Sequence, residues 1–168
     1  MTLRLRWLAL LAACACMPAW ALQPSGDVAT ASNLQHDGRL ALQKSEPVLI
    51  VFTSPDCRYC DRVIHYYLVP MQRNPDPAGS VLIRRLDLTS PRKLVDFSGH
   101  VTTERAFASK LKVNFAPTVM LFTPDGKPAA HPLVGLGPED YYGGFLDQAV
   151  ETAHARMHGA NPEAATGM

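Results

Sequence analysis

Cys57 and Cys60 are the residues of this chain whose type and spacing most directly allow chemistry. Two thiols at this spacing can close into a small disulfide ring and open again on reduction. They follow an apolar run and are expected to begin a helix, whose free N–H groups and partial positive charge favour a thiolate. We interpret the pair as a redox centre in which Cys57 attacks a disulfide and Cys60, one turn further in, resolves the mixed disulfide.

Two other interpretations of the cysteine pair stay open on the residues alone. The pair could form a static structural disulfide, which an exported protein can keep. It could also hold a metal ion, although a structural zinc site wants four ligands and no second CxxC or paired histidine follows. His65, His100 and His131 are scattered and are expected at the surface. We therefore predict no metal site and no cofactor.

The elements that position the cysteines can be predicted from the apolar pattern. The continuous β-branched run over 48–53 is typical of a central strand that is covered on both faces. A helix is expected to start near Cys57 and to present an apolar inner face as far as Leu68. Pro70 should then stop or kink that helix, because proline lacks the backbone N–H that a helix interior uses.

The rest of the chain alternates between helical and strand patterns. We expect a helix over 27–44, a strand over 81–88, irregular chain over 89–101, a helix over 102–112, a strand over 119–123, a hairpin turn over 124–127, a partner strand over 130–134 and a last helix over 138–154. Adjacent Arg84 and Arg85 place their strand near a sheet edge, and Phe52, Phe115 and Phe122 are expected in the core. A strand–helix–strand unit implies a parallel pair. The predicted fold is α/β, with a central mixed sheet flanked by helices on both faces.

Length and charge limit the class of protein. The 168 residues are enough for one domain with a real hydrophobic core. The 16 basic and 15 acidic side chains give a formal net charge of +1, and the basic residues form no stripe along the sequence. Nothing in this pattern indicates binding to nucleic acid.

The first residues are typical of an export signal. Two arginines precede an apolar run that is too short to span a bilayer, and Ala19-Trp20-Ala21 fits the small-x-small cleavage rule. We expect cleavage after Ala21; an uncleaved anchor and lipoprotein processing at Cys14 are the alternatives. The predicted organisation is a signal peptide at 1–21, an N-terminal segment with a helix at 22–43, the main domain at 44–157 and a disordered tail at 158–168.

With these residues assembled, the chain resembles the thioredoxin superfamily. The resemblance rests on the apolar strand that leads into Cys57 and Cys60, and on Ala116-Pro117-Thr118 ahead of a downstream strand; it covers about 44–155. It implies the thioredoxin fold, with Pro117 following a cis peptide bond and lying against the active-site disulfide.

The resemblance also implies a substrate site around the cysteines. The backbone of Ala116 would pair with an extended substrate segment, in the manner of strand addition. Arg58 and Tyr59 would border the substrate, although for Tyr59 an ordinary half-exposed aromatic residue is an equal alternative. The chain departs from cytosolic thioredoxins in carrying Val51 where they bury an aspartate. Proton transfer to Cys60 must then use water or another group.

Among the superfamily, the chain looks most similar to exported bacterial thioredoxins, including those associated with sulfur-oxidation operons and with periplasmic disulfide reduction. That similarity implies a periplasmic thiol–disulfide oxidoreductase that reduces disulfides of partner proteins. It also implies that a membrane thiol transporter donates the electrons and that this protein contacts the transporter only transiently. The alternatives are a disulfide oxidase or isomerase, and a copper-binding or metallochaperone module of the same fold.

Overall fold

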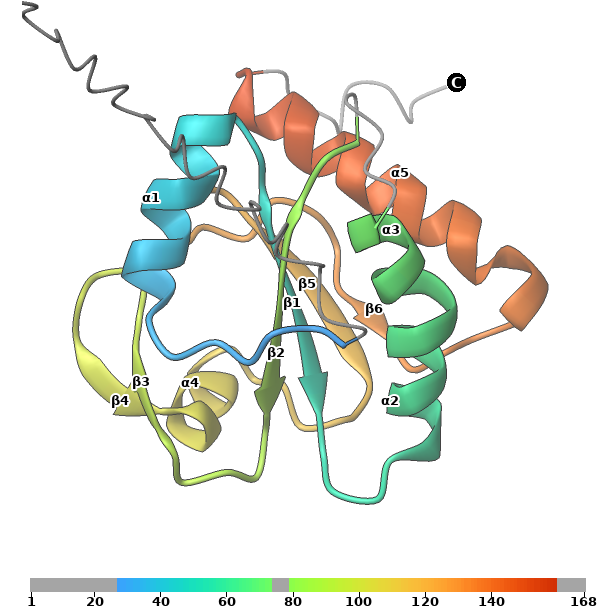
Figure 1. The fold of residues 1–168 in the computed structure, drawn as a ribbon, viewed down its shortest axis with the longest axis horizontal. Helices are drawn as coiled ribbons and strands as arrows, with labels where there is room; N and C mark the ends of the chain where they lie inside the picture. The colour runs from blue at the N-terminus through green and yellow to red at the C-terminus, as the bar shows by residue number, and fades with distance from the viewer. Residues whose placement is uncertain (1–26, 74–78, 160–168) are drawn as a thin grey trace, which may run out of the picture.

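A four-stranded sheet forms the centre of the computed structural model, which describes residues 27–73 and 79–159. Its strands lie in the order β2 (Leu82–Asp87), β1 (Val48–Thr53), β5 (Thr118–Phe122) and β6 (Leu133–Val134). β1 pairs with β2 in parallel, whereas β5 is antiparallel to both β1 and β6. Figure 1 shows this mixed sheet with helices on both of its faces, so the predicted fold class is confirmed.

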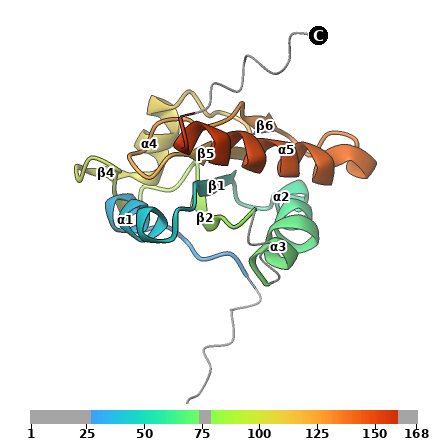
Figure 2. The same ribbon diagram turned by 90° about the horizontal axis from the view of Figure 1, so that it is seen from above.

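The two central strands are buried along their whole length, as the apolar run predicted for β1. One face of the sheet packs against α5 (Glu139–Met157) and the helical segment that follows the cysteines, and the other packs against α1 (Leu34–Lys44) and α4 (Glu104–Lys110). Figure 2 shows α5 and α2 (Arg58–Val63) separated from α1 by the sheet strands. Phe52 and Phe122 lie fully buried in the layer of α1 and α4, in agreement with their expected place in the core.

The predicted helix over 27–44 begins later than its apolar pattern suggested. Asn33 has an extended backbone and its side chain accepts the N–H of His36, so it caps α1, which starts at Leu34. The residues before Asn33 run beside β2 instead, with Thr30 bridged in parallel to Arg85. β2 is thus one of the two outer strands of the four-stranded sheet, as Arg84 and Arg85 indicated. The extended segment before Asn33 covers its outer edge.

The predicted irregular stretch over 89–101 contains a small hairpin. β3 (Lys93–Val95) pairs with β4 (Val101–Thr103) as a separate two-stranded sheet. The turn is held by the buried carboxylate of Asp96, which accepts the N–H groups of Ser98 and His100, both at 2.9 Å. Both strands are only three residues long, which is too short to show a period of two in the sequence.

The helix after the cysteines continues past Pro70. It runs as α2, a π-helical turn η1 (Ile64–Leu68) and α3 (Val69–Arg73), with the N–H of Val69 bonded to the carbonyl of Ile64. A proline in a regular α-helix removes one hydrogen bond and collides with the preceding turn. The wider π-turn ends just before Pro70. Its hydrogen bonds join residues five apart instead of four, and this change occurs where proline cannot donate the regular helical bond. The helix is therefore altered at this point and not ended.

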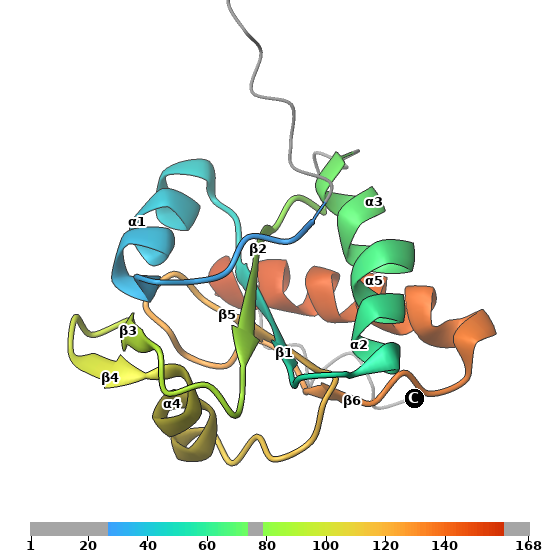
Figure 3. The same ribbon diagram turned by 60° about the horizontal axis from the view of Figure 1, so that its bottom comes forward.

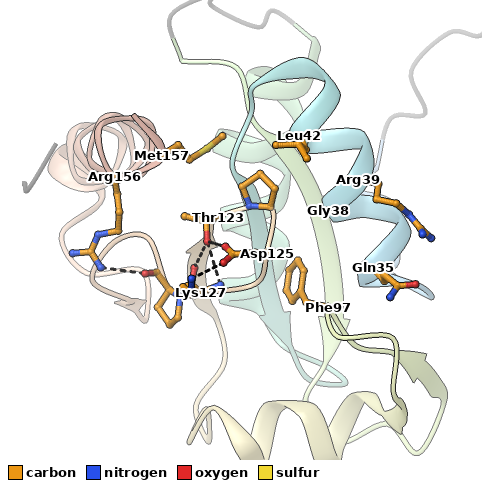
Figure 4. A pocket seen from close by; sticks show the side chains of 12 residues that line it. Gln35, Gly38, Arg39, Leu42, Phe97, Thr123, Asp125, Lys127, Arg156 and Met157 are labelled. Carbon is orange, nitrogen blue, oxygen red and sulfur yellow. Dashed lines mark hydrogen bonds and ion pairs between the residues drawn. The ribbon is translucent and has the colours of Figure 1, made fainter. Parts of the chain in front are cut away.

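The predicted hairpin turn over 124–127 is confirmed. The N–H of Thr123 donates to the carbonyl of Lys127 at 2.9 Å, and the N–H of Gly126 donates to the carbonyl of Thr123 at 2.8 Å. Side-chain contacts among Thr123, Asp125 and Lys127 reinforce the turn, as Figure 4 shows. The lysine and the threonine, through their hydrogen bonds, lower the pKa of the Asp125 carboxyl. The turn lies at the amino end of β1, because Val48 pairs with Phe122.

β6 and α5 close the fold. β6 is shorter than predicted, since it covers only Leu133 and Val134, although Pro128 forms an isolated bridge with Phe122 of β5. α5 follows Pro138 as expected and extends to Met157. The predicted signal peptide, the rest of the chain before Asp27, residues 74–78 and most of the predicted tail lie outside the described residues. Within the described ranges, no helix is both long and apolar enough to cross a membrane.

Candidate active site

Cys57 and Cys60 are joined in a disulfide at the start of α2, with an S–S distance of 2.05 Å. Figure 3 brings forward the turn that links the carboxyl end of β1 to α2, where this disulfide lies. Cys57 is the N-cap of the helix, and its sulfur accepts the N–H of Cys60 at 3.1 Å. The helix therefore directs a backbone donor at the sulfur that is expected to act as nucleophile.

The two sulfurs differ in exposure. Cys57 is half-buried, whereas Cys60 is 2 % exposed. This asymmetry agrees with the positions expected from their order along the helix. An incoming substrate sulfur can reach Cys57 from solvent, while Cys60 is far less accessible to it.

A second loop reaches the same end of the sheet. Phe52 pairs with Thr118, so Ala116 and Pro117 lie just beyond β5, at the edge where β1 delivers the cysteines. The peptide bond between Ala116 and Pro117 is cis. Pro117 is buried and its carbonyl accepts the N–H of Gly135 at 2.7 Å. The Thr118 hydroxyl donates to the carbonyl of Phe115 at 2.8 Å, which fixes the loop from its other side.

The outer surface of the site carries the residues between the cysteines. Arg58 and Tyr59 are both exposed, Tyr59 to 62 %, on the first turn of α2. This exposure fits a substrate-bordering residue and an ordinary surface aromatic equally well. Asp56 and Asp61 are exposed on either side of the pair, as their sequence positions suggested.

Phe115 is not a core residue, and its expected burial is wrong. Its side chain is 56 % exposed in the loop that precedes Pro117. The ring lies beside Gly135, whose missing Cβ would stand 3.8 Å from the Phe115 ring edge. Val134, next to that glycine, is 63 % exposed. Sequence reasoning missed this apolar surface because a lone phenylalanine before a proline has no periodicity that assigns it to a face.

A small, partly open polar cavity lies beside Cys60. It has a volume of about 220 Å³ and is lined by Cys60 together with Thr53 at the end of β1, Asp61, and Asp87 at the end of β2. Arg85, Arg92, Thr30 and Ser54 supply the rest of the polar part of its wall. Nothing in the sequence pattern indicated this cavity, since its residues come from separate segments of the chain.

The charges around this cavity are largely paired. Arg92 donates to the fully buried carboxylate of Glu104 at 2.5 Å, and this hydrogen bond raises the pKa of the Arg92 guanidinium. The second oxygen of Glu104 accepts the N–H of Asp87 at 2.8 Å. Arg85 lies 3.3 Å from a carboxylate oxygen of Asp27. Glu104 thus anchors α4 to the end of β2, directly behind the site.

Among the described residues, no cluster of three or more histidine, cysteine, aspartate or glutamate side chains is arranged to hold a metal ion. The larger cavity of Figure 4, about 570 Å³, lies at the opposite end of the sheet, between α1, the hairpin turn and the end of α5. It contains neither cysteine. The chemistry that the arrangement at the disulfide supports is therefore reversible thiol–disulfide exchange at Cys57 and Cys60.

Comparison with known proteins agrees with this geometry. Residues 34–149 match the thioredoxin-like domain family, and the chain belongs to that family. No curated protein matches the chain. Among solved structures, the DsbH oxidoreductase is similar with 14 % identity and a TM-score of 0.52, over 77 % of this chain and 90 % of its own. The reduced periplasmic thioredoxin SoxS from Paracoccus pantotrophus shares 23 % identity with a TM-score of 0.44, over 64 % of this chain and 99 % of its own.

Proposed function

We propose that this chain is an exported thiol–disulfide oxidoreductase that reduces disulfides in partner proteins. The observation that supports it best is the Cys57–Cys60 disulfide, with one accessible and one buried sulfur, at the N-terminus of α2. A static disulfide has no need of this asymmetry. An exchange centre does, because the first sulfur must meet the substrate and the second must be kept from doing so.

The reaction follows from that arrangement. In the reduced protein, the Cys57 thiolate attacks one sulfur of a substrate disulfide, and the other substrate sulfur leaves as a thiolate. Cys60 then attacks the Cys57 sulfur, the bond to the substrate breaks, and the Cys57–Cys60 disulfide forms. Two electrons pass from the dithiol to the substrate. Ala116 and Pro117 would hold an extended substrate segment beside Cys57 through the backbone of Ala116.

Purified protein tests the activity directly. With dithiothreitol as electron source, the wild-type chain should accelerate the reduction of insulin disulfides, and a chain with both cysteines replaced by serine should not. An inactive wild-type protein that keeps its cysteines locked in the disulfide under dithiothreitol would favour the structural interpretation. The direction of electron flow in the cell depends on the reduction potential, which is a second measurement.

The reduction potential separates a reductase from an oxidase. We expect a value nearer to that of thioredoxin, about −270 mV, than to that of the oxidant DsbA, about −120 mV. For this two-electron couple about 30 mV corresponds to about 1.4 kcal/mol, so one charge near Cys57 shifts the balance appreciably. A potential near the oxidising end would replace the reductase proposal with an oxidase.

Export and the electron donor are part of the same proposal. They rest on the sequence of residues 1–21, which is typical of an export signal. In a bacterial host, the mature protein should be recovered from the periplasm with Leu22 as its first residue. A membrane thiol transporter would then supply electrons, and a mixed disulfide between it and Cys57 is the species to isolate.

A further inference from the structure

The buried position of Cys60 raises the question of where its proton goes. Cys60 must become a thiolate to attack the mixed disulfide, but the residue is almost completely buried, with an exposed fraction of 2 %. Val51 on the neighbouring strand is fully buried and offers no proton acceptor. Cys60 does line the small polar cavity, which is partly open to solvent. Its volume of about 220 Å³ is several times the share of one water in the liquid, about 30 Å³.

Four charged side chains line that cavity, and they come from different elements. Asp61 belongs to α2, Arg85 and Asp87 to β2, and Arg92 to the loop before β3. Both arginines have carboxylate partners, Arg85 with Asp27 and Arg92 with the buried Glu104. A guanidinium is already protonated, so the two aspartates are the charged groups on the wall that can accept a proton.

Asp87 is the better placed of the two aspartates. It is half-buried and pairs in register with Thr53, another cavity residue, whereas Asp61 is exposed on the helix surface. The Oδ1 atom of Asp87 accepts the backbone N–H and the hydroxyl of Thr89, both at 2.8 Å. Its Oδ2 atom makes no hydrogen bond within the described ranges. The carboxylate is thus held in place with one oxygen left to accept a proton.

We propose that Asp87 accepts, through water in this cavity, the proton that Cys60 loses during the resolving step. This inference rests on the proposed function. The Cys60 sulfur supplies the electron pair of the new bond to Cys57, and the bond from Cys57 to the substrate breaks. That bonding pair leaves on the substrate sulfur, and the Cys60 proton passes to Asp87 and from there to solvent. No further oxidant or reductant is required.

A two-phase thiol assay isolates the step. When the reduced protein meets an aromatic disulfide that releases coloured thionitrobenzoate, attack by Cys57 releases the first equivalent and attack by Cys60 releases the second. Asp87→Asn keeps an oxygen that can accept from Thr89 but cannot take up a proton. We expect the first phase to be unchanged and the second to slow by about tenfold or more near neutral pH. The slowed phase should recover as pH rises, because hydroxide replaces the missing acceptor.

The sign of the effect separates proton transfer from a simple charge effect. If Asp87 acted only through its charge, removing that charge would favour the Cys60 thiolate and the second phase would become faster. An unchanged or faster second phase in Asp87→Asn would therefore overturn the inference. Asp61→Asn is the matched control, since it removes a carboxylate from the same wall, and its second phase should stay within about twofold of wild type. Equal slowing in both variants would refute the assignment to Asp87.

A second variant covers loss of structure. Asp87→Glu retains a carboxylate at a shifted position and should resolve faster than Asp87→Asn at equal thermal stability. If the two variants are equally slow, the carboxylate has no part in the step. The wild-type protein separates the two proposals: if it releases no second equivalent and does not reduce insulin, the proposed function fails. If it does both while Asp87→Asn matches it, only the role of Asp87 is lost.

Discussion

At the scale of single residues, Cys57 and Cys60 have the same chemistry and different surroundings. Cys57 caps the N-terminus of α2 and is half-buried, while Cys60 is buried and lines the small polar cavity. We expect Cys57→Ser to abolish insulin reduction, because no other thiol among the described residues is open to the substrate. Cys60→Ser should retain the first attack and accumulate mixed disulfides, which non-reducing electrophoresis of cell extracts would detect. Absence of covalent partners in the Cys60→Ser protein would show that the assignment of roles is wrong.

Tyr142 offers a test of stability that is separate from the redox site. It is buried in the layer of α5, its ring centroid lies 4.9 Å from that of Tyr67, and its hydroxyl has no hydrogen-bond partner among the described residues. A buried unsatisfied hydroxyl is costly. Tyr142→Phe should therefore leave the free energy of unfolding unchanged or raise it by about 1 kcal/mol, as measured by urea denaturation. A loss of more than about 1 kcal/mol would show that the hydroxyl is bonded after all.

The same hydroxyl predicts how stability depends on alkaline pH. Burial, with a smaller contribution from Tyr67, raises the pKa of Tyr142 above its ordinary value. The unfolded tyrosine ionises near pH 10, at about its reference value, while the native one stays protonated. Stability is thus fully present below about pH 10 and falls as pH rises toward the native pKa, by up to about 1.4 kcal/mol per pH unit. Tyr142→Phe should remove this fall, and the exposed neighbour change Tyr141→Phe should not.

At the scale of elements, two helical glycines are expected to respond in opposite ways to alanine. A Cβ at Gly38 in α1 would stand 2.3 Å from the carbonyl oxygen of Pro124, so α1 packs on the hairpin turn at a distance that only glycine allows. Gly144 in α5 has nothing within 4 Å of such an atom. Gly38→Ala should lose about 1–3 kcal/mol through forced repacking. Gly144→Ala should gain up to about 1 kcal/mol from helix propensity.

Chemical denaturation of both glycine variants beside the wild type measures this difference. The pair is a matched control, because each change adds the same methyl group to a helix. If both variants gained stability, the close approach of α1 to the turn would be wrong. If both lost it, helix propensity would not govern α5 at that position.

At the scale of the whole molecule, the segment before α1 belongs to the folded unit. Val28 and Ala31 are buried, the N–H of Ala31 donates to the carbonyl of Arg85, and the N–H of Arg85 donates to the carbonyl of Ala29. The family match begins only at Leu34. A chain starting at Leu34 should therefore be less stable than one starting at Asp27, by on the order of 3 kcal/mol from lost apolar burial. Equal melting temperatures of the two chains would show that the segment before Leu34, which pairs with β2, does not contribute to stability.

The sequence by itself determined the features that are written in contiguous residues. The β-branched run of β1, the spacing of Cys57 and Cys60, and the turn at 124–127 each specify a local structure through short-range sterics and hydrogen bonding. Together they were enough to predict the mixed sheet and the class of site. Phe115 is a residue for which this reasoning failed, because a hydrophobic side chain alone does not indicate whether it faces the core or solvent.

The tertiary structure decided everything that depends on segments meeting from far apart in the chain. The start of α1 at Leu34 reflects the pairing of the preceding residues with β2, and the need for glycine at position 38 reflects the approach of Pro124. The cavity beside Cys60 exists because the ends of β1 and β2, the first turn of α2 and the loop before β3 converge there. Burial and mutual distance are properties of the assembled chain, because they depend on contacts between residues that are remote in sequence and that no local pattern records.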